Sequence, residues 1–516
     1  MPEQLNASPR FQEQFLFAGI PASSILRVTS HGVVFGFVSA DDGTLRFLWG
    51  GSFGDPFMDV VASRDKHVFF MSPDGEHVAY IAKATEGYFV GRDGTRSALY
   101  SHASLSAPPT FSHGGTHLAY AAEIDGRARL IFDGAVLGEE DAAPVAPVFS
   151  PDGSRFAYVE QRLPAKGNPE HRIVLDGSTG PWFTGMRNAV GVMQFSPDSR
   201  RFAYHQANAK LEARWTVDGI PQRWFNEVPK LSLAGLRGIG VLGAPMGATF
   251  SPDSRRFAYA ADVKEKGVAV VEDDVLGPLM KGVNPPVFSA DSRRLAYMAE
   301  TLDKHFCAVV DGVVGNSWPF KAVSPLIISG DGSHIAFVFQ REAGGFLSKK
   351  HSVGLVVDDE IVAEVPGEDA ATGPAFSPDG RHIAWYIRRG KRGQMFVDDQ
   401  PGPELDGADS PMFTADGGIR YIGLRRDVAL LMKEGVPSST GLRPAVLSES
   451  GDSYLQSADN AHVAWIGLTG GNKGHPVFDD EVGPRYDLVF FCLFMNGREP
   501  RWWGLRDSSV YQITHE

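Results

Sequence analysis

The chain has 516 residues, more than one ordinary compact domain holds, and its 43% hydrophobic and 22% charged residues are typical of a soluble globular protein. Its formal net charge of −13 argues against a protein that coats nucleic acid with its whole surface, although a local basic patch remains compatible with it. The two cysteines, Cys307 and Cys492, lie far apart, which argues against a disulfide framework or a structural zinc site. The sequence predicts no metal site and no cofactor.

The N-terminal segment does not have the pattern of a secretory signal. It lacks a basic start, and its apolar stretch, residues 15–20, is short. No apolar run elsewhere is long enough to span a membrane. We therefore expect a cytoplasmic protein, or a periplasmic one if a leader preceded residue 1.

A repeat starts near residue 30 and recurs about every forty residues, the period of a four-stranded propeller blade. Residues 149–158 read Phe-Ser-Pro-Asp-Gly-Ser-Arg-Phe-Ala-Tyr, and residues 195–204 and 250–259 share Phe-Ser-Pro-Asp-Ser-Arg-Arg-Phe-Ala-Tyr. Residues 288–297 and 376–385 differ slightly. Weaker copies begin at Phe70, Phe111, Ile328 and Phe413, and degenerate ones surround Ser30, Ser457 and Asn496. Together they predict about twelve blades.

Each copy predicts a strand, a tight turn and a second strand. In the turn, Pro presets φ, Asp bonds nearby backbone, and Gly tolerates positive φ. The small Ala between two aromatic residues suits a strand pressed against the next blade. We expect the recurring turn aspartates to be architectural: Asp74, Asp152, Asp198, Asp253, Asp291, Asp331 and Asp379.

A second signature follows within each repeat and ends in Asp-Gly or Asp-Asp. An apolar stretch before such a pair predicts a third strand entering a hairpin turn. The copies are residues 173–177, 215–219, 308–312, 355–359, 395–399 and 476–480. Gly-Pro beside aromatic residues then marks a fourth strand, as in residues 180–183. No long segment has the helical period of 3.6, so the sequence predicts an all-β protein.

The Phe-Ser-Pro-Asp-Gly/Ser-x-x-Ala-Tyr core resembles the WD-like repeats of TolB-type β-propellers, which also build the non-catalytic propellers of prolyl-oligopeptidase-like and tricorn-like peptidases. The resemblance covers nearly the whole chain and implies a β-propeller fold. It implies no single activity, because propellers host unrelated functions. The chain departs from TolB in lacking a signal peptide and in having about twice as many repeats. It departs from the peptidases in having no α/β-hydrolase segment outside the repeats.

The number of repeats predicts more than one ring. Single propellers have about 4–8 blades, so we expect two rings of about six. The widest gap between repeats holds a Gly-rich insert or crossing, residues 228–247. We therefore place a first group of blades at residues 1–235 and a second group at residues 248–516.

The number of strands in the last repeat favours a different way of closing the propeller. The last repeat supplies only three strands, near residues 489–495, 501–505 and 510–514, and the segment 14–19 would provide the fourth. That pairing would remove an exposed sheet edge. It fits either one unusually large ring closed by the N-terminal strand or a ring with the other inserted into it.

Two motifs resemble catalytic or cofactor signatures. Residues 50–54 match the nucleophile elbow Gly-x-Ser-x-Gly, and residues 238–243 match the dinucleotide fingerprint Gly-x-Gly-x-x-Gly. Each needs a strand before it and a helix after it. Neither flank predicts a helix, so we interpret the first as a hairpin turn and the second as a turned insert that is long enough to cover a ligand or contact a partner.

Charged turns have a structural interpretation as well. The acidic pairs lack the spacing of a calcium loop, and Arg pairs precede the second strands at residues 200–201, 255–256 and 293–294. Both kinds of turn lie on one face of a propeller, so we expect Arg–Asp pairing between them. Histidines recur at the same place in the repeat, as at His117 and His334, which indicates architecture rather than catalysis.

Basic residues gather in the predicted loops between the second and third strands of three consecutive repeats, on the opposite face. A basic patch there would favour an acidic protein segment, a phosphate-bearing ligand or, less readily, nucleic acid. The alternative is a set of solvated loop tips relieved by Glu368, Asp369, Asp406 and Asp409. The candidate partner-binding residues are Arg341, Lys349, Lys350, Arg388, Arg389, Lys391, Arg392, Arg425 and Arg426.

Two functions remain open. Because the fold accounts for every specific motif, we expect a non-catalytic binding or scaffold protein that presents its loops or central funnel to another protein or peptide, such as an acidic one. The alternative is an enzyme or small-ligand receptor whose polar residues converge in the funnel from several blades. The sequence identifies no catalytic residue for that alternative.

Overall fold

The computed structural model describes residues 9–515 except 19, 22–23, 41, 63–67, 105–106, 139–141, 185–189, 209, 211, 227–246, 323, 344–349, 368–369, 372, 409–410, 415–416, 427, 434–435, 446–453, 459–460, 471–472 and 496–498. Every named element in this part of the chain is a β-strand. None of the described residues belongs to a helix with the length and hydropathy needed to cross a membrane.

The strands are grouped in antiparallel sheets that follow one another along the sequence. Ten sheets have four or five strands, and one has nine because β25 (Phe225–Asn226) joins two blades. Counted as two, the nine-stranded sheet brings the described blades to twelve, which agrees with the repeats. We letter the strands of a blade a to d along the chain, except that strand d of blade 12 comes from the N-terminal segment.

Strands b and c form the centre of each blade. From blade 1 to blade 12 they are β3 (Val34–Ser39) and β4 (Leu45–Trp49), β8 (Val78–Ala84) and β9 (Gly87–Arg92), β13 (Leu118–Ile124) and β14 (Arg127–Phe132), β17 (Phe156–Arg162) and β18 (Glu170–Leu175), β22 (Phe202–Ala207) and β23 (Glu212–Val217), β27 (Phe257–Val263) and β28 (Gly267–Glu272), β32 (Leu295–Glu300) and β33 (Phe306–Val310), β37 (Ile335–Ala343) and β38 (Lys350–Val357), β42 (Ile383–Arg389) and β43 (Arg392–Val397), β47 (Ile419–Arg425) and β48 (Val428–Lys433), β52 (Val463–Leu468) and β53 (Gly474–Phe478), and β56 (Glu499–Arg506) and β57 (Ser509–His515).

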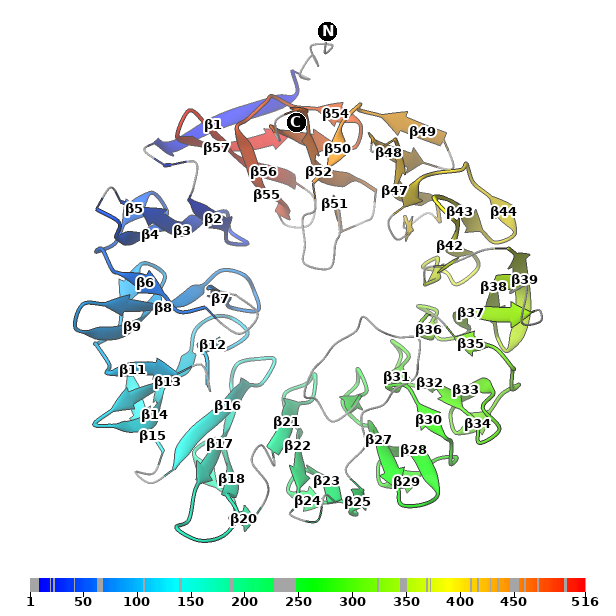
Figure 1. The fold of residues 1–516 in the computed structure, drawn as a ribbon, viewed down its shortest axis with the longest axis horizontal. Coiled ribbons are helices and arrows are strands. Elements are labelled where there is room, and N and C mark those ends of the chain that lie inside the picture. Colours follow the sequence, from blue (N-terminus) through cyan, green and yellow to red (C-terminus); the bar gives the residue numbers. More distant parts are fainter. Residues whose placement is uncertain are drawn as a thin grey trace.

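The other two strands lie on either side of this pair and are shorter in most blades. Strand a is often split, as in β6 (Asp59–Val60) and β7 (Phe70–Met71), and β7 lies nearest the centre of the ring (Figure 1). Strand d lies at the circumference and is usually two residues long, as in β10 (Thr95–Arg96). The outer strand of blade 8, β39 (Glu360–Pro366), is longer.

The twelve blades are arranged around one ring, as Figure 1 shows. The last blade takes its outer strand from the other end of the chain, because β1 (Phe11–Ala18) pairs antiparallel with β57. Beside it, Arg506 donates to both carboxylate oxygens of Glu13, at 3.0 and 2.8 Å. Strand β2 (Ile25–Val28) of blade 1 contacts β55 (Leu488–Met495) of blade 12. The N-terminal strand therefore closes the ring, as the three-stranded last repeat indicated.

The blades follow one another around a single ring in Figure 1, which corresponds to the alternative that we gave to two rings of about six. Blades 5 and 6 flank the place where we expected a boundary, yet Asn226 of β25 pairs with Asp262 of β27. The expected insert, residues 228–247, lies outside the described residues except for Gly247. The contacts between these two blades repeat those at the next blade boundary. The repeat sequence alone therefore does not indicate whether two consecutive blades belong to the same ring or to different rings.

The repeat sequence explains how the blades pack. Strand b is buried on both faces, and Phe257, Ala258 and Tyr259 have at most 2% of their surface exposed. Tyr259 faces blade 5, where it lies in a cluster with Trp215. Ala258 lies on the other face, in a cluster with Tyr297 of blade 7. The small side chain leaves room for the neighbouring aromatic ring.

A glycine directly after strand d completes this packing. A Cβ at Gly277 would lie 2.9 Å from the carbonyl oxygen of Val270 and 3.4 Å from the hydroxyl of Tyr297 in the next blade. The same contact recurs at Gly402, whose Cβ would lie 3.2 Å from the hydroxyl of Tyr421. At these two positions the Gly-Pro pair after strand d is thus explained by the close approach of the next blade.

Candidate functional site

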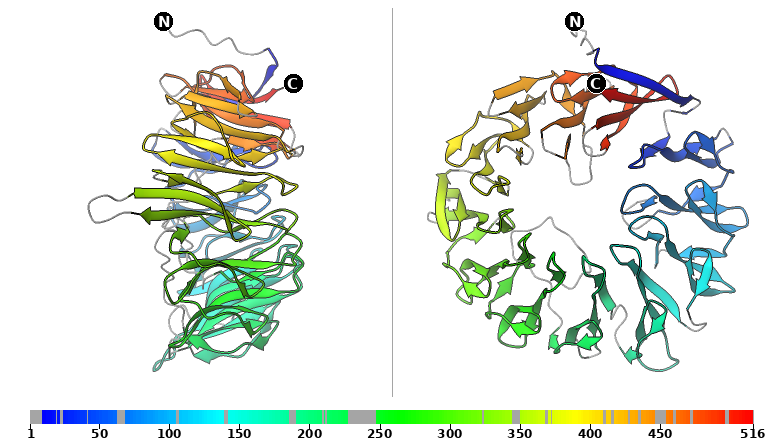
Figure 2. Two further views of the ribbon diagram at one scale, coloured as in Figure 1. Left: turned by 90° about the vertical axis from the view of Figure 1, so that its right-hand side faces the viewer. Right: turned by 180° about the vertical axis from the view of Figure 1, so that it is seen from behind.

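The ring has two faces with different chemistry. The a–b and c–d turns lie on one side, here called the turn face. The b–c loops and the connections from strand d to the next blade lie on the other side, here called the loop face. Viewed from the edge of the ring, the hairpin of β37 and β38 extends farther than the neighbouring strands (Figure 2).

The turn aspartates are held by their own turns. Ser251 Oγ donates to Asp253 Oδ1 at 2.6 Å, and the backbone N–H of Arg255 donates to the same oxygen at 3.2 Å. These hydrogen bonds hold the pKa of Asp253 below its usual value. The same serine-to-aspartate bond occurs at Asp74, Asp152, Asp198, Asp291, Asp331 and Asp379. The carboxylates are therefore engaged in shaping the turns.

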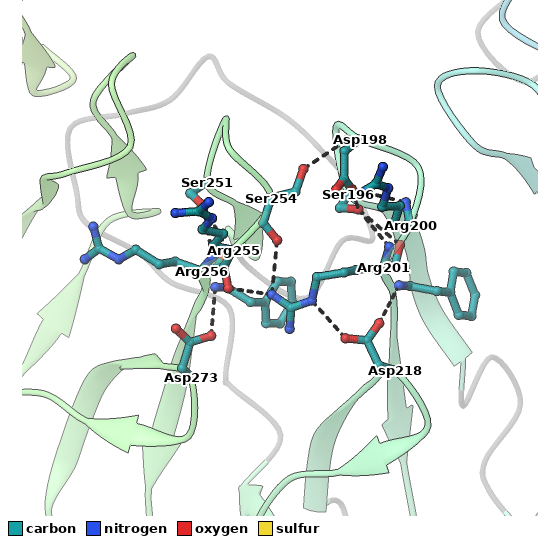
Figure 3. Close-up of polar contacts among 12 residues, drawn as sticks. Ser196, Asp198, Arg200, Arg201, Asp218, Ser251, Ser254, Arg255, Arg256 and Asp273 are labelled. Atoms are coloured by element: carbon teal, nitrogen blue, oxygen red, sulfur yellow. Dashed lines mark hydrogen bonds and ion pairs between the residues drawn. The ribbon is translucent and has the colours of Figure 1, made fainter.

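Hydrogen bonds on the turn face connect successive blades (Figure 3). The backbone N–H of Asp198 donates to Ser254 Oγ at 2.9 Å, across the boundary between blades 5 and 6. Arg201 donates to the carbonyl oxygens of Ser254 and Arg255 at 3.2 and 2.6 Å, and it also pairs with Asp218 of its own blade at 2.8 Å. Each bond contributes about 1 kcal/mol of net stability.

In blades 4 to 7 the last residue of the turn makes this second connection. Arg155, Arg201, Arg256 and Arg294 occupy that position in blades 4 to 7, and each reaches carbonyl oxygens of the following blade. In blades 2, 3, 8, 9 and 11 a histidine stands there and its ring bonds to an aspartate of the same blade, as His382 Nδ1 does with Asp398 at 2.8 Å. An imidazole is shorter than an arginine side chain, so it does not bridge the gap.

On the loop face, exposed cations come from two consecutive blades. The five residues form what we call the basic cluster: Arg388, Lys391 and Arg392 of blade 9, and Arg425 and Arg426 of blade 10. Lys349 lies outside the described residues, and only the backbone of Lys350 and Arg389 is described. The acidic residues Glu368, Asp369 and Asp409 lie outside the described residues too.

Two acidic residues on the connection between blades 9 and 10 organise the basic cluster. Arg392 donates to the carboxylate of Glu404 at 2.8 Å. From the next blade, Arg425 donates to the backbone carbonyl of Glu404 at 3.4 Å. The carboxylate of Asp406 accepts the backbone N–H of Arg426 at 2.6 Å. The sequence indicated Asp406 as a nearby acid but did not indicate Glu404, because its position follows from the blade geometry.

Arg341 of blade 8 has a different environment. Its guanidinium lies 3.3 Å from the carboxylate of Glu364 and stacks 5.5 and 5.6 Å from the ring centres of Phe320 and Phe339. The side chain is therefore engaged in packing within blade 8. The structure does not group it with the exposed cations.

The motifs that resemble catalytic signatures occupy ordinary places in the fold. Gly50 and Gly51 have φ of 55° and 90° and form the turn between β4 and β5 (Ser52–Phe53). Residues 238–243 lie outside the described residues. Among the residues that the structure describes, no group of three His, Cys, Asp or Glu side chains is arranged to hold a metal ion.

Sequence reasoning missed a buried ion pair in blade 4. Arg172 and Glu160 face each other across β17 and β18 with side chains 8% and 1% exposed, and Arg172 Nε donates to Glu160 at 2.6 Å. The guanidinium carbon of Arg172 lies 4.6 Å from the ring centre of Trp182. In blade 5 the matching residues are Gln206 and Arg214, which bond at 2.9 Å. The departure from the apolar pattern of the repeat was the available signal.

Comparisons with known proteins give similarities of fold only. No protein-family model matches the chain, and no curated protein matches it. The chain is similar to a crystal structure of a eukaryotic initiation factor, at 12% identity over 75% of this chain and 90% of that chain, with a TM-score of 0.35. It is also similar to the β-propeller domain of the Trilobed protease from Pyrococcus furiosus, at 13% identity over 59% and 96% of the two chains, with a TM-score of 0.25. For TolB from Acinetobacter baumannii the identity is 16% over 49% and 61%, with a TM-score of 0.23.

Proposed function

We propose that this β-propeller is a non-catalytic binding protein that holds an acidic segment of another protein on its loop face. The observation that carries the proposal is the basic cluster of blades 9 and 10. Its five exposed cations are accompanied, among the described residues, by the two carboxylates of Glu404 and Asp406. The chain as a whole has a formal net charge of −13, whereas positive charge exceeds negative charge among these described residues.

The charge of the basic cluster suits a binding surface better than a structural one. Arg392 and Glu404 have side chains 70% and 60% exposed, and a pair this exposed contributes at most about 1 kcal/mol to folding. A partner with several carboxylates would bring more opposite charge than the cluster itself contains. Complementary charge raises the association rate and fixes the orientation of the partner.

The underlying blades hold the cluster in place. The b–c loops of blades 9 and 10 are neighbours, because β43 of one blade contacts β45 (Gly407–Ala408) of the next. Arg425 connects these blades through its bond to Glu404. A surface that is ordered before binding loses less entropy when the partner arrives, which favours affinity.

A peptide-binding measurement tests the proposal. The probe is a fluorescein-labelled decaglutamate peptide, and its anisotropy is followed during titration with the full chain at low and high salt. We expect binding at low salt that weakens as salt rises, because the contacts are exposed ion pairs. The test variant replaces Arg388, Lys391 and Arg426 by glutamate.

The control variant changes the same charge on the opposite face. Its substitutions are Arg255→Glu, Arg293→Glu and Arg381→Glu, at side chains that are 86%, 85% and 82% exposed. We expect the loop-face variant to lose binding and the turn-face control to retain it. Equal loss in both variants would mean that overall charge, rather than the basic cluster, attracts the peptide, and the proposal would fail.

A further inference from the structure

The basic cluster contains four arginines and one lysine, and two of the arginines meet at a single residue. Arg392 reaches the carboxylate of Glu404 from blade 9, and Arg425 reaches its backbone carbonyl from blade 10. Guanidinium groups from two blades are therefore held on either side of the connection between those blades. The next residue, Arg426, is fixed by the bond between its backbone N–H and Asp406.

Arginine and lysine recognise anions differently. A guanidinium is a planar fork that donates two parallel hydrogen bonds to a phosphate or carboxylate, whereas an ammonium acts as a compact charge. A surface that needed only positive charge would be served equally well by lysines. The four arginines of the basic cluster can offer such forks to a ligand with several oxygens.

Glu404 sets a condition that the ligand must meet. The ligand has to attract Arg392 more strongly than this carboxylate does, or bind beside it. A phosphate monoester carries a charge of about −1.5 to −2 at pH 7 and has three acceptor oxygens. It can therefore accept from guanidinium groups of both blades at once, whereas one carboxylate has a single charge and two oxygens.

We infer that the basic cluster recognises a phosphorylated residue within the acidic segment that it binds. This inference rests on the proposed function, since it names the chemistry of the same partner. The phosphate lies between Arg392 and Arg425, and Arg388, Lys391 and Arg426 meet the carboxylates that flank it. Phosphorylation of the partner would then control its attachment to the propeller.

Three peptides of one sequence provide the test. Each carries four glutamates on either side of a central position that is serine, phosphoserine or glutamate, and anisotropy is measured with the full chain at 0.1 M salt. We expect the phosphoserine peptide to bind at least tenfold more tightly than the serine peptide and severalfold more tightly than the glutamate peptide. Its advantage should shrink below pH 6, where the phosphate loses its second charge.

Lysine substitutions retain the positive charge but remove the forked guanidinium. They therefore distinguish recognition of the phosphate from general attraction between opposite charges. Arg392→Lys with Arg425→Lys should abolish the preference for phosphoserine while the glutamate peptide binds as before. The control, Arg255→Lys with Arg293→Lys on the turn face, should change neither affinity. If the glutamate and phosphoserine peptides bind equally, the inference is overturned and the proposed function stands. If none of the peptides binds, the proposed function fails as well.

Discussion

Ser254 forms a hydrogen bond between blades 5 and 6, but its backbone conformation is unfavourable. Two substitutions distinguish the contribution of the hydrogen bond from that of the backbone. Its φ is 65°, in the region that glycine adopts readily and other residues avoid. Glycine stands at the matching position of several other blades, as at Gly153. Ser254 is 2% exposed and accepts the backbone N–H of Asp198 through its Oγ. We therefore compare Ser254→Ala with Ser254→Gly.

Both substitutions remove the acceptor, but only one relieves the backbone. Loss of the hydrogen bond to a partly buried N–H costs about 1–2 kcal/mol. Alanine retains a Cβ at positive φ, so no relief of the backbone offsets the loss of the hydrogen bond. Glycine removes the conformational cost, and after allowing for its greater freedom in the unfolded chain the gain is about 0.5–1 kcal/mol. We expect the alanine variant to be less stable than the glycine variant by that amount.

Hydrogen exchange followed by mass spectrometry measures the effect at the blade boundary. In both variants the amide of Asp198 should exchange roughly tenfold faster, since about 1.4 kcal/mol corresponds to a factor of ten. The peptide containing Asp152 is an internal control, because its amide donates to Ser199 Oγ at 3.0 Å across the boundary between blades 4 and 5 and is not altered. Denaturant unfolding of the full chain provides the comparison of stability.

Two results would refute this reasoning. Unchanged exchange at Asp198 in both variants would show that the bond to Ser254 does not protect the boundary. Equal stability of the alanine and glycine variants would show that no conformational cost is present at this position. The same pair of substitutions at Ser292, whose φ is 64°, should repeat the pattern one blade farther along the ring.

The remaining predictions concern pH. Burial lowers the pKa of His205 from 6.5 to about 4, so the unfolded chain takes up its proton first and stability falls, by on the order of 3 kcal/mol, as the pH drops from 6.5 to 4. His205→Leu should flatten that part of a stability–pH curve measured by denaturant unfolding, and an unchanged slope would exclude His205 as its source. The hydrogen bond to Asp398 raises the pKa of His382, so its contribution is fully present below pH 6.5 and is lost as the pH rises through the raised value. His382→Asn should therefore destabilise the protein at pH 5.5 and have little effect at pH 9, and the opposite ordering would contradict this sign.

The local sequence predicted the strands and turns of each blade, but it did not determine how many blades form one ring. Strand b at residues 257–259 and the turn before it are encoded within ten residues, because φ preferences and side-chain alternation act over short distances. The number of blades in a ring depends on the small angle between neighbouring blades. That angle arises from the sum of contacts such as Ala258 with Tyr297, and no single residue type signals it.

The candidate site was predictable in part for a similar reason. Arg388, Lys391 and Arg392 follow one another closely in the chain, so their proximity was visible in the sequence. Their approach to Arg425 depends on how blade 10 lies against blade 9. Glu404, which lies between the two groups, carries no repeat signature. In the same way, the two residues of the buried pair in blade 4 are separated in sequence and meet only through the register of β17 and β18.

The pairing of β1 with β57 has a consequence for where this polypeptide could be cut. Because Phe11 lies opposite His515, the two ends of the described chain sit in one blade, and the order of blades around the ring is cyclic. A covalent link there and a new opening in an exposed loop, such as that between β17 and β18, would leave every boundary between blades as it is. A circularly permuted chain that begins and ends in another exposed loop would thus form the same contacts between blades.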